Sequence, residues 1–202
     1  MDTTIHKNRN YFLKDDTEQI KNVLLDAGII LYPTDTIWGV GCDATNPVAI
    51  ERIYNLKERD RSKPFVLLVS DIEMLKNYIE AGHPRIETLL SFHVRPLTVI
   101  YEEGKNLPKN AMSSDGSVAI RIVKDTFCQQ LISDLGRPMV ATSANISEQP
   151  FPATFGEISS EVIQGVDYVV NHRRDDKTVS EPSVIVKCTP KGELVFIREK
   201  VF

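Results

Sequence analysis

The sequence has few of the patterns that mark metal centres, disulfide frameworks or membrane spans. Its three cysteines lie far apart, at positions 42, 128 and 188, and form no CxxC pair. This odd count is typical of a reducing compartment and argues against a structural metal site. The four histidines show no HxxxH or HExxH spacing. No apolar run approaches the roughly 20 residues of a membrane-spanning helix, and residues 1–9 lack the apolar core of a secretory signal. We therefore expect a cytoplasmic protein that makes no use of a membrane.

Common nucleotide-binding and nucleophile motifs are also missing. The chain contains no GxxxxGK[ST] loop and no GxGxxG, so a nucleotide would have to bind outside these designs. No GxSxG elbow surrounds Ser143, which argues against a serine nucleophile. The net charge of -4 and the pI near 5.6 argue against a surface coated in basic charge for nonspecific binding of nucleic acid. They leave room for a local basic pocket.

Length and patterning favour one α/β domain over residues 1–202. The 42% apolar content is that of an ordinary globular protein. Helices and strands alternate irregularly, which predicts a twisted, mixed parallel and antiparallel sheet flanked by helices. We expect residues 1–10 to be a flexible or loosely packed N-terminus. Strands are expected at 28–33, 65–69, 97–101, 118–123, 138–142, 166–170, 183–187 and 193–198, and helices from 16 or 17 to 28, from 47 to 57, from 71, and at 84–92, 125–135 and 156–164.

Several helix ends carry recognisable signals. Asp16 or Thr17 suits the N-cap of the first helix, and Gly28 can end that helix in the left-handed conformation. Asn46 followed by Pro47 is typical of a helix start. The long polar segments 102–117 and 143–156 are expected to be loops, where binding residues often lie.

A basic string, Lys-Glu-Arg-Asp-Arg-Ser-Lys at 57–63, stands out in this acidic chain. A solvated helix end is one interpretation, because charge runs are usually exposed. A phosphate site is the other, because lysine and arginine supply charge and donors for phosphate oxygens. Lys57 and Arg59 are two residues apart and would diverge on a regular helix, so they converge on a ligand only if the helix ends there.

Segment 32–41 follows the first expected strand and contains hydroxyls and two glycines. These residues can line a ligand cleft, or they form a turn in which Asp35 caps local amides. Composition alone favours the turn.

Arg121 lies in the otherwise apolar strand 118–123. An unpaired buried guanidinium is expensive, so Arg121 either pairs with an internal acid or binds an anionic group such as a carboxylate. Both interpretations stay open. After the strand at 138–142, Ser143 and Asn145 offer short polar groups where a ligand can approach closely.

Taken in order, these strings resemble the YrdC-like family of threonylcarbamoyl-AMP synthases. The resemblance runs from about Ala27 to Arg198, and the chain looks like the short, single-domain form. Its elements are Tyr-Pro-Thr-Asp-Thr at 32–36, Lys-Glu-Arg at 57–59, Lys63-Pro64, Pro-Leu-Thr at 96–98, Arg121, Thr-Ser-Ala-Asn at 142–145 and Pro182-Ser183.

The resemblance implies an enzyme that combines L-threonine, bicarbonate or CO2, and ATP into L-threonylcarbamoyladenylate and pyrophosphate. Mg2+ would accompany ATP through its phosphates, and a separate transferase complex would pass the threonylcarbamoyl group to tRNA. By position, Lys57 and Arg59 are the expected catalytic residues. The ATP-binding set implied in the same way is Lys57, Arg59, Lys63, Ser117, Ser143, Asn145 and Arg198. The threonine-binding set is Thr34, Arg121 and Ser183.

The chain departs from the family pattern at several loops. His93-Val94-Arg95 stands where Trp-Pro-Gly is frequent, Val123 replaces a proline, and Glu148 stands where glycine is common. Glu199-Lys200 also differs from the usual residues after the late arginine. Two alternatives remain on the same fold: an RNA-binding module that grips phosphates with residues 57–63, and a nucleotide-binding regulator without turnover.

Overall fold

The computed structural model describes residues 15–189 and 193–198, in which nine strands form one mixed sheet. The prediction for residues 1–10 lies outside this range. The strands are β1 (Ile30–Tyr32), β2 (Gly39–Gly41), β3 (Val66–Val69), β4 (Leu97–Tyr101), β5 (Val118–Ile122), β6 (Met139–Ser143), β7 (Tyr168–Val169), β8 (Val184–Cys188) and β9 (Leu194–Arg198). The helices are α1 (Thr17–Leu25), α2 (Pro47–Leu56), α3 (Ile72–Lys76), α4 (Pro84–Phe92), α5 (Thr126–Leu135) and α6 (Ser160–Gly165), with short 3-10 turns at Lys109–Ala111 and Phe155–Glu157.

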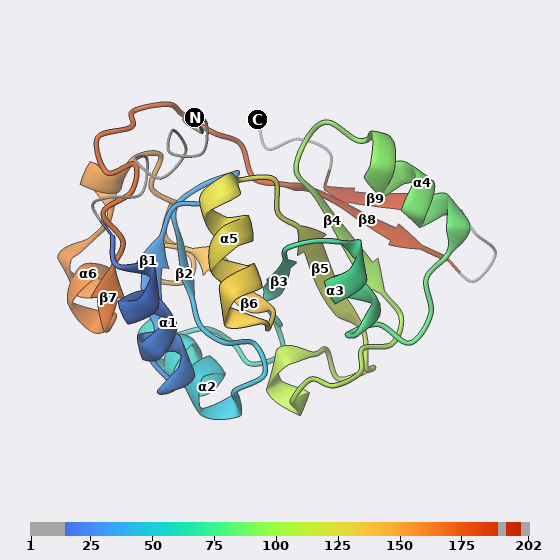
Figure 1. The fold of residues 1–202 in the computed structure, drawn as a ribbon, viewed down its shortest axis with the longest axis horizontal. Helices are drawn as coiled ribbons and strands as arrows, with labels where there is room; N and C mark the ends of the chain where they lie inside the picture. The colour runs from blue at the N-terminus through green and yellow to red at the C-terminus, as the bar shows by residue number, and fades with distance from the viewer. Residues whose placement is uncertain (1–14, 190–192, 199–202) are drawn as a thin grey trace, which may run out of the picture.

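The sheet combines parallel and antiparallel pairs, as predicted. Its order is β7-β1-β2-β6-β3-β5-β4-β8-β9 (Figure 1). The β1–β7, β3–β5 and β4–β8 pairs are parallel, and the other five are antiparallel. The mixed α/β fold expected from the sequence is confirmed.

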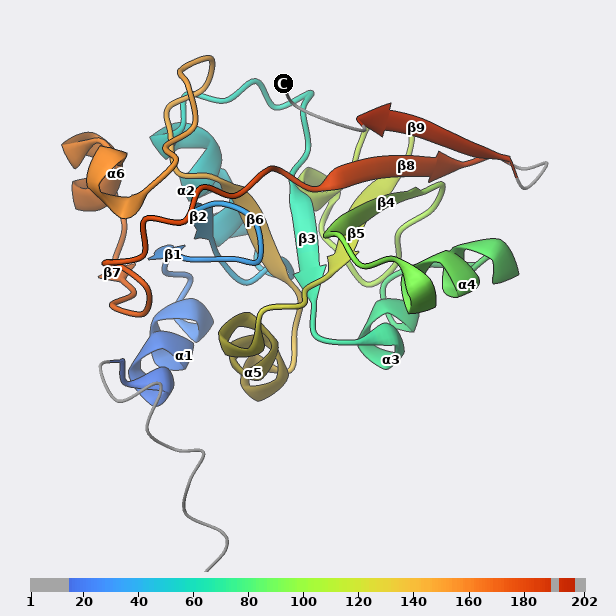
Figure 2. The ribbon, with the colours of Figure 1, turned by 90° about the horizontal axis from the view of Figure 1, so that it is seen from above.

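Alternation along the strands assigns side chains to two layers. In β3, Leu67 and Val69 pack into one apolar core, together with the inner faces of α2, α3 and α4. Leu68 points to the second core, which α1 and α5 cover. These two helices lie side by side in both views (Figures 1 and 2). They cover only part of that face of the sheet, and the rest carries the cleft described below.

The predicted starts of α1 and α2 are confirmed, and the predicted end of α1 needs one correction. The side chains of Asp16 and Asn46 accept hydrogen bonds from backbone amides at the starts of α1 and α2. Such caps are each worth about 1 kcal/mol. The prediction of a left-handed Gly28 is wrong: Ala27 takes that conformation, with φ of 57°. Glycine is needed at position 28 because its backbone packs closely against Val23: a Cβ there would lie 2.5 Å from the Val23 carbonyl oxygen.

Strand β2 and the start of α6 differ from the expected elements. Gly-Val-Gly has little strand propensity, so no strand is predicted at 39–41. Glycine is required at Gly41, because a Cβ there would lie 2.6 Å from the Tyr32 ring. The helix expected at 156–164 is a 3-10 turn followed by α6, which restarts at its N-cap Ser159. No helix within the described residues is long and apolar enough to cross a bilayer.

Candidate active site

The basic string folds into a turn at the end of α2. Lys57 is the C-cap residue, and the next residue, Glu58, has a left-handed φ of 50°. Regular helical geometry therefore stops between Lys57 and Arg59. The Arg59 guanidinium donates to the carbonyls of Lys63 and Pro64 and lies over the Phe65 ring. These contacts fold the loop 57–64 against the residues that lead into β3, a central strand of the sheet.

Lys57 joins this turn to the end of β6. Its Nζ donates to the Ser143 carbonyl at 2.6 Å and also to the Asn145 carbonyl. The Ser147 amide donates back to the Lys57 carbonyl at 2.9 Å. The side chain is 1% exposed. Burial, and secondarily the nearby Arg59 charge, lowers the pKa of Lys57 to about 7.

The loop after β6 is held by the Asn145 side chain. Its Nδ2 donates to the carbonyls of Ile146 and Gln149, while Oδ1 is buried without a hydrogen-bond partner. The loop lies at the same end of the molecule as α2 (Figure 2). The two strings at 57–63 and 142–145 thus meet, although 86 residues separate Lys57 from Ser143.

A cleft of about 460 Å³ opens on the part of the sheet that α1 and α5 leave uncovered. Its floor includes a registered row across four adjacent strands: Ile100 faces Ala119, Ala119 faces Val66, and Val66 faces Ala141. The two alanines have short side chains, so they leave space above the strand backbones. Small side chains on central strands, where bulkier ones would fill the face, therefore make room for a ligand.

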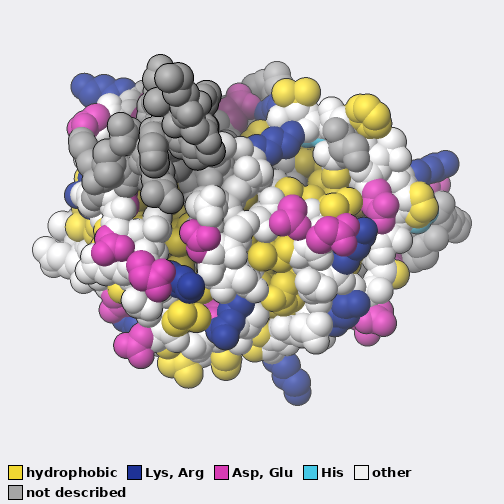
Figure 3. Space-filling model, viewed as in Figure 1, with side chains coloured by type: hydrophobic (Ala, Val, Ile, Leu, Met, Phe, Trp, Pro, Cys, Tyr) yellow, Lys and Arg dark blue, Asp and Glu magenta, His cyan; other side chains and the backbone are white. Residues whose placement is uncertain are grey.

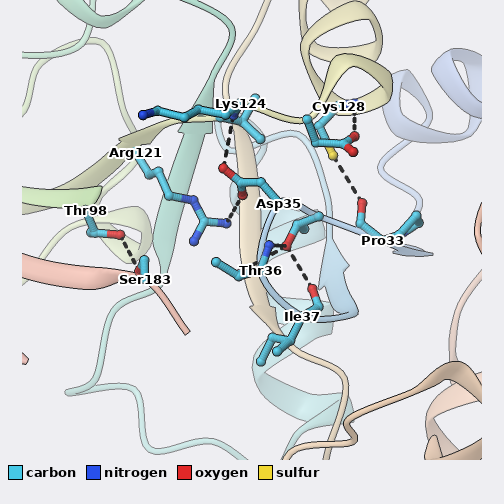
Figure 4. A network of polar contacts seen from close by, with 12 residues as sticks. Pro33, Asp35, Thr36, Ile37, Thr98, Arg121, Lys124, Cys128 and Ser183 are labelled. Atoms are coloured by element: carbon cyan, nitrogen blue, oxygen red, sulfur yellow. Dashed lines mark hydrogen bonds and ion pairs between the residues drawn. The ribbon is translucent and has the colours of Figure 1, made fainter. Parts of the chain in front are cut away.

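Arg121 is buried beside the cleft and faces an acid. Its guanidinium lies 3.1 Å from Asp35, and both side chains are at least nine-tenths buried (Figure 4). Asp35 also accepts a hydrogen bond from the Lys124 amide at 3.0 Å. The Arg121 Nε has no hydrogen-bond partner. The two interpretations of Arg121 are thus compatible: it pairs with an internal acid, it lines the cleft, and its hydrogen-bonding capacity is not filled by the described residues.

A second polar group lies next to the Arg121 guanidinium. The hydroxyls of Thr98 and Ser183 are 2.8 Å apart (Figure 4). Arg198 donates to the Ser183 carbonyl at 3.0 Å and to its hydroxyl at 3.3 Å. Burial, followed by repulsion from Arg121, lowers the pKa of Arg198. The two arginines thus bring positive charge to one end of the cleft.

The remaining predicted residues also lie at this site. The Thr34 hydroxyl donates to the Ile37 carbonyl at 2.8 Å, and the Ser117 hydroxyl donates to Asp115 at 2.6 Å. Both residues line the cleft. Lys63 lines an adjoining cavity of about 480 Å³. Segment 32–41 therefore lines a cleft, contrary to the turn that composition favoured, and Asp35 interacts with the distant residues Lys124 and Arg121.

All ten predicted site residues surround these two cavities. The cleft is lined by Thr34, Arg59, Ser117, Arg121, Ser143, Ser183 and Arg198, and the adjoining cavity by Lys57, Arg59, Lys63, Ser143 and Asn145. Arg59 and Ser143 border both.

Two further residues at the site escaped sequence reasoning. Asp35 was not identified as the partner of Arg121, although the buried arginine was a signal that an acid was needed. Phe151 borders both cavities. It lies in a segment expected to be a polar loop, where nothing marked it.

The two cavities differ in charge. Among the described residues that line it, the cleft has three arginines and no carboxylate. The adjoining cavity has three cations as well, but Glu58, Asp60 and Glu148 also line it. The cleft therefore suits carboxylate or phosphate groups, and the adjoining cavity presents both signs of charge.

Comparison with known proteins decides the family. The Sua5/YciO/YrdC family model, which carries the description "telomere recombination", matches residues 22–200. The chain belongs to this family. The resemblance read from the short strings is thereby confirmed.

Relatives within the Sua5/YciO/YrdC family cover most of the chain. A threonylcarbamoyl-AMP synthase of Vibrio parahaemolyticus is 31% identical over 73% of this chain and 82% of its own length. A putative threonylcarbamoyl-AMP synthase of Methanocaldococcus jannaschii is 31% identical over 91% of this chain and 85% of its own. A P. abyssi Sua5 structure solved with L-threonine superposes with a TM-score of 0.80 at 21% identity. That alignment covers 91% of this chain and 54% of the Sua5 chain, so it supports the shared fold.

Proposed function

We propose that this chain is an L-threonylcarbamoyladenylate synthase, which joins L-threonine, bicarbonate or CO2, and ATP and releases pyrophosphate. One observation carries the proposal. Lys57 and Arg59 meet Ser143 and Asn145 at the wall between two adjoining cavities, and Arg121 lies beside one of them with an unpartnered donor. A triphosphate and an amino-acid carboxylate can therefore bind side by side.

The reaction begins with the free amine of threonine, which adds to CO2 and loses a proton to give a carbamate. A carbamate oxygen then attacks the α-phosphorus of ATP in line. The bond from that phosphorus to the oxygen bridging to the β-phosphate breaks, and pyrophosphate leaves with the bond electrons. Carbamates are short-lived in water, so a sheltered cleft favours the product.

The protein's part in this step is positioning and charge stabilisation. Arg121 binds the threonine carboxylate through its guanidinium group, and Thr34 and Ser183 hold the rest of the amino acid. Arg59 and Lys57 offset negative charge on the leaving pyrophosphate, while Ser143 and Asn145 fix phosphate oxygens. Lys63, Ser117 and Arg198 complete the contacts to ATP. ATP binds as its magnesium complex, in which the metal neutralises phosphate charge.

The adenylate would next pass to a tRNA threonylcarbamoyl-transferase complex in the cytoplasm. Direct binding of RNA phosphates by the basic string at 57–63 is less well supported than the synthase function, because the cations of this string do not form one exposed surface. Lys57 is buried, Arg59 bonds to loop carbonyls, and Arg61 pairs with Glu51. On the opposite side of the sheet from α2, acidic and basic side chains are interspersed (Figure 3).

The test is detection of the product. Purified protein is incubated with ATP, MgCl2, bicarbonate and L-threonine, and the mixture is followed by pyrophosphate release and by mass spectrometry. The expected result is an adenylate whose mass rises with isotope-labelled threonine and with labelled bicarbonate. Pyrophosphate release that does not depend on threonine, or nucleotide binding without any adenylate, would contradict the proposal.

A further inference from the structure

Glu148 has an unusual position in the adjoining cavity. It lines that cavity from the loop after β6, whereas Lys57, Arg59 and Lys63 line it from the turn after α2. Its backbone φ is 69°, a left-handed conformation that glycine adopts freely and glutamate rarely does. The left-handed backbone disfavours glutamate at this position, and a carboxylate would repel a polyanionic ligand in the cavity. Glutamate at this position therefore calls for a reason other than folding.

The other two acids of this cavity have a different setting. Asp60 accepts the Ser62 amide at 2.9 Å, a hydrogen bond that lowers the pKa of its carboxyl and commits it to the local turn. Glu58 directly follows the cap of α2, on the same wall as the three cations. Glu148 alone among the three lines the cavity from the loop after β6.

We infer that Glu148 makes this cavity selective for metal-bound over metal-free polyphosphate. The inference rests on the proposed function, since it assigns the adjoining cavity to the phosphates of ATP or to pyrophosphate. A carboxylate next to a phosphate site repels a ligand in proportion to the ligand's charge. Metal-free ATP carries about two more negative charges than its magnesium complex, so Glu148 weakens its binding more. The same repulsion speeds the departure of pyrophosphate that has lost its metal.

The test compares the binding of inorganic pyrophosphate and ATP to the wild type and to Glu148→Gln by calorimetry. Each ligand is titrated once with excess EDTA and once with MgCl2. Gln keeps the size and the strained backbone and removes only the charge. We expect metal-free ligands to bind Glu148→Gln roughly three- to tenfold more tightly than wild type at low salt, with a smaller change for magnesium complexes.

Two further variants separate charge from backbone strain. Glu148→Gly removes both, so it should match Glu148→Gln in the ratio of metal-free to metal-bound affinity while melting at a higher temperature. Glu161→Gln removes an exposed acid of α6 outside both cavities and should leave the ratio unchanged.

The outcomes distinguish this inference from the proposed function. A wild-type protein that makes the adenylate, but whose affinity ratio is the same in Glu148→Gln, overturns the role of Glu148 alone. Equal tightening in Glu161→Gln also overturns it, because the effect would then be one of net charge. A wild type that binds neither ATP nor pyrophosphate overturns both.

Discussion

The pKa of Lys57 makes nucleotide binding depend on pH in a way that can be measured. Burial lowers this pKa to about 7 in the free protein. At pH 8 about a tenth of the Lys57 side chains are then protonated. A bound polyphosphate favours the ammonium form and raises the pKa again. Binding at pH 8 should therefore take up about 0.9 of a proton, and affinity should fall up to about tenfold from pH 8 to pH 9.

Calorimetry provides the assay for this uptake. ATP is titrated at pH 8, where its phosphates are ionised, in two buffers of different ionisation enthalpy. The difference in observed binding enthalpy, divided by the difference in buffer enthalpy, gives the number of protons taken up. Lys57→Met keeps the length of the side chain and removes the titrating amine, so its uptake should fall to near zero. The melting temperature of this variant checks that the fold is intact.

Two results would contradict the predicted role of Lys57. ATP binding by the wild type without proton uptake would mean that Lys57 is already charged, or that the ligand does not reach it. Undiminished uptake in Lys57→Met would assign the proton to another group. The sign is also fixed: because the pKa is low in the free state and higher in the complex, affinity must weaken, not strengthen, as the pH rises above 7.

Three more predictions follow from the geometry. Arg59→Ala should lower kcat/KM for ATP by roughly ten- to a thousandfold, about 1.4–4 kcal/mol. The control Arg61→Ala removes a guanidinium that pairs with Glu51, and it should change kcat/KM by less than about threefold. Equal losses in the two variants would mean that only the overall positive charge matters. Arg121→Ala should raise the KM for threonine more than that for ATP in pyrophosphate-release assays, and the opposite order would contradict the carboxylate role. Gly41→Ala should lower the free energy of unfolding in urea by about 2–4 kcal/mol, because its Cβ would meet the Tyr32 ring; a loss under about 0.5 kcal/mol would mean that the strand yields.

Most helices and strands could be predicted because their signals are local. Alternating or continuous apolar runs marked eight of the nine described strands at or near their observed places, and Asp16, Asn46, Asp71 and Asp125 each cap the helix that follows. Strand β2 had no such signal, because Gly-Val-Gly has little strand propensity and Gly41 is required by the closeness of the Val140 carbonyl and the Tyr32 ring. The order of the strands was not predictable either, since pairings such as β2–β6 join residues about a hundred positions apart.

The candidate site was predictable only as a set of residues. The family resemblance implied ten site residues, and all ten line the two cavities. Their arrangement depends on irregular backbone that periodicity does not reveal. Lys57 and Arg59 reach the same wall because α2 ends at Lys57 and Glu58 turns the chain with a positive φ.

The pairing of Arg121 with Asp35 shows why a charge argument from sequence stops short of an assignment. Burial of one arginine requires compensation, but it does not say whether the partner is an acid of the protein or a ligand. Here Asp35 faces one end of the guanidinium, while Nε has no partner within the described residues. An ion pair that is neutral overall yet incompletely hydrogen-bonded tolerates burial in the free protein and retains a donor for a carboxylate. The two interpretations left open by the sequence therefore hold together: Arg121 pairs with Asp35 and is also positioned to bind a carboxylate ligand.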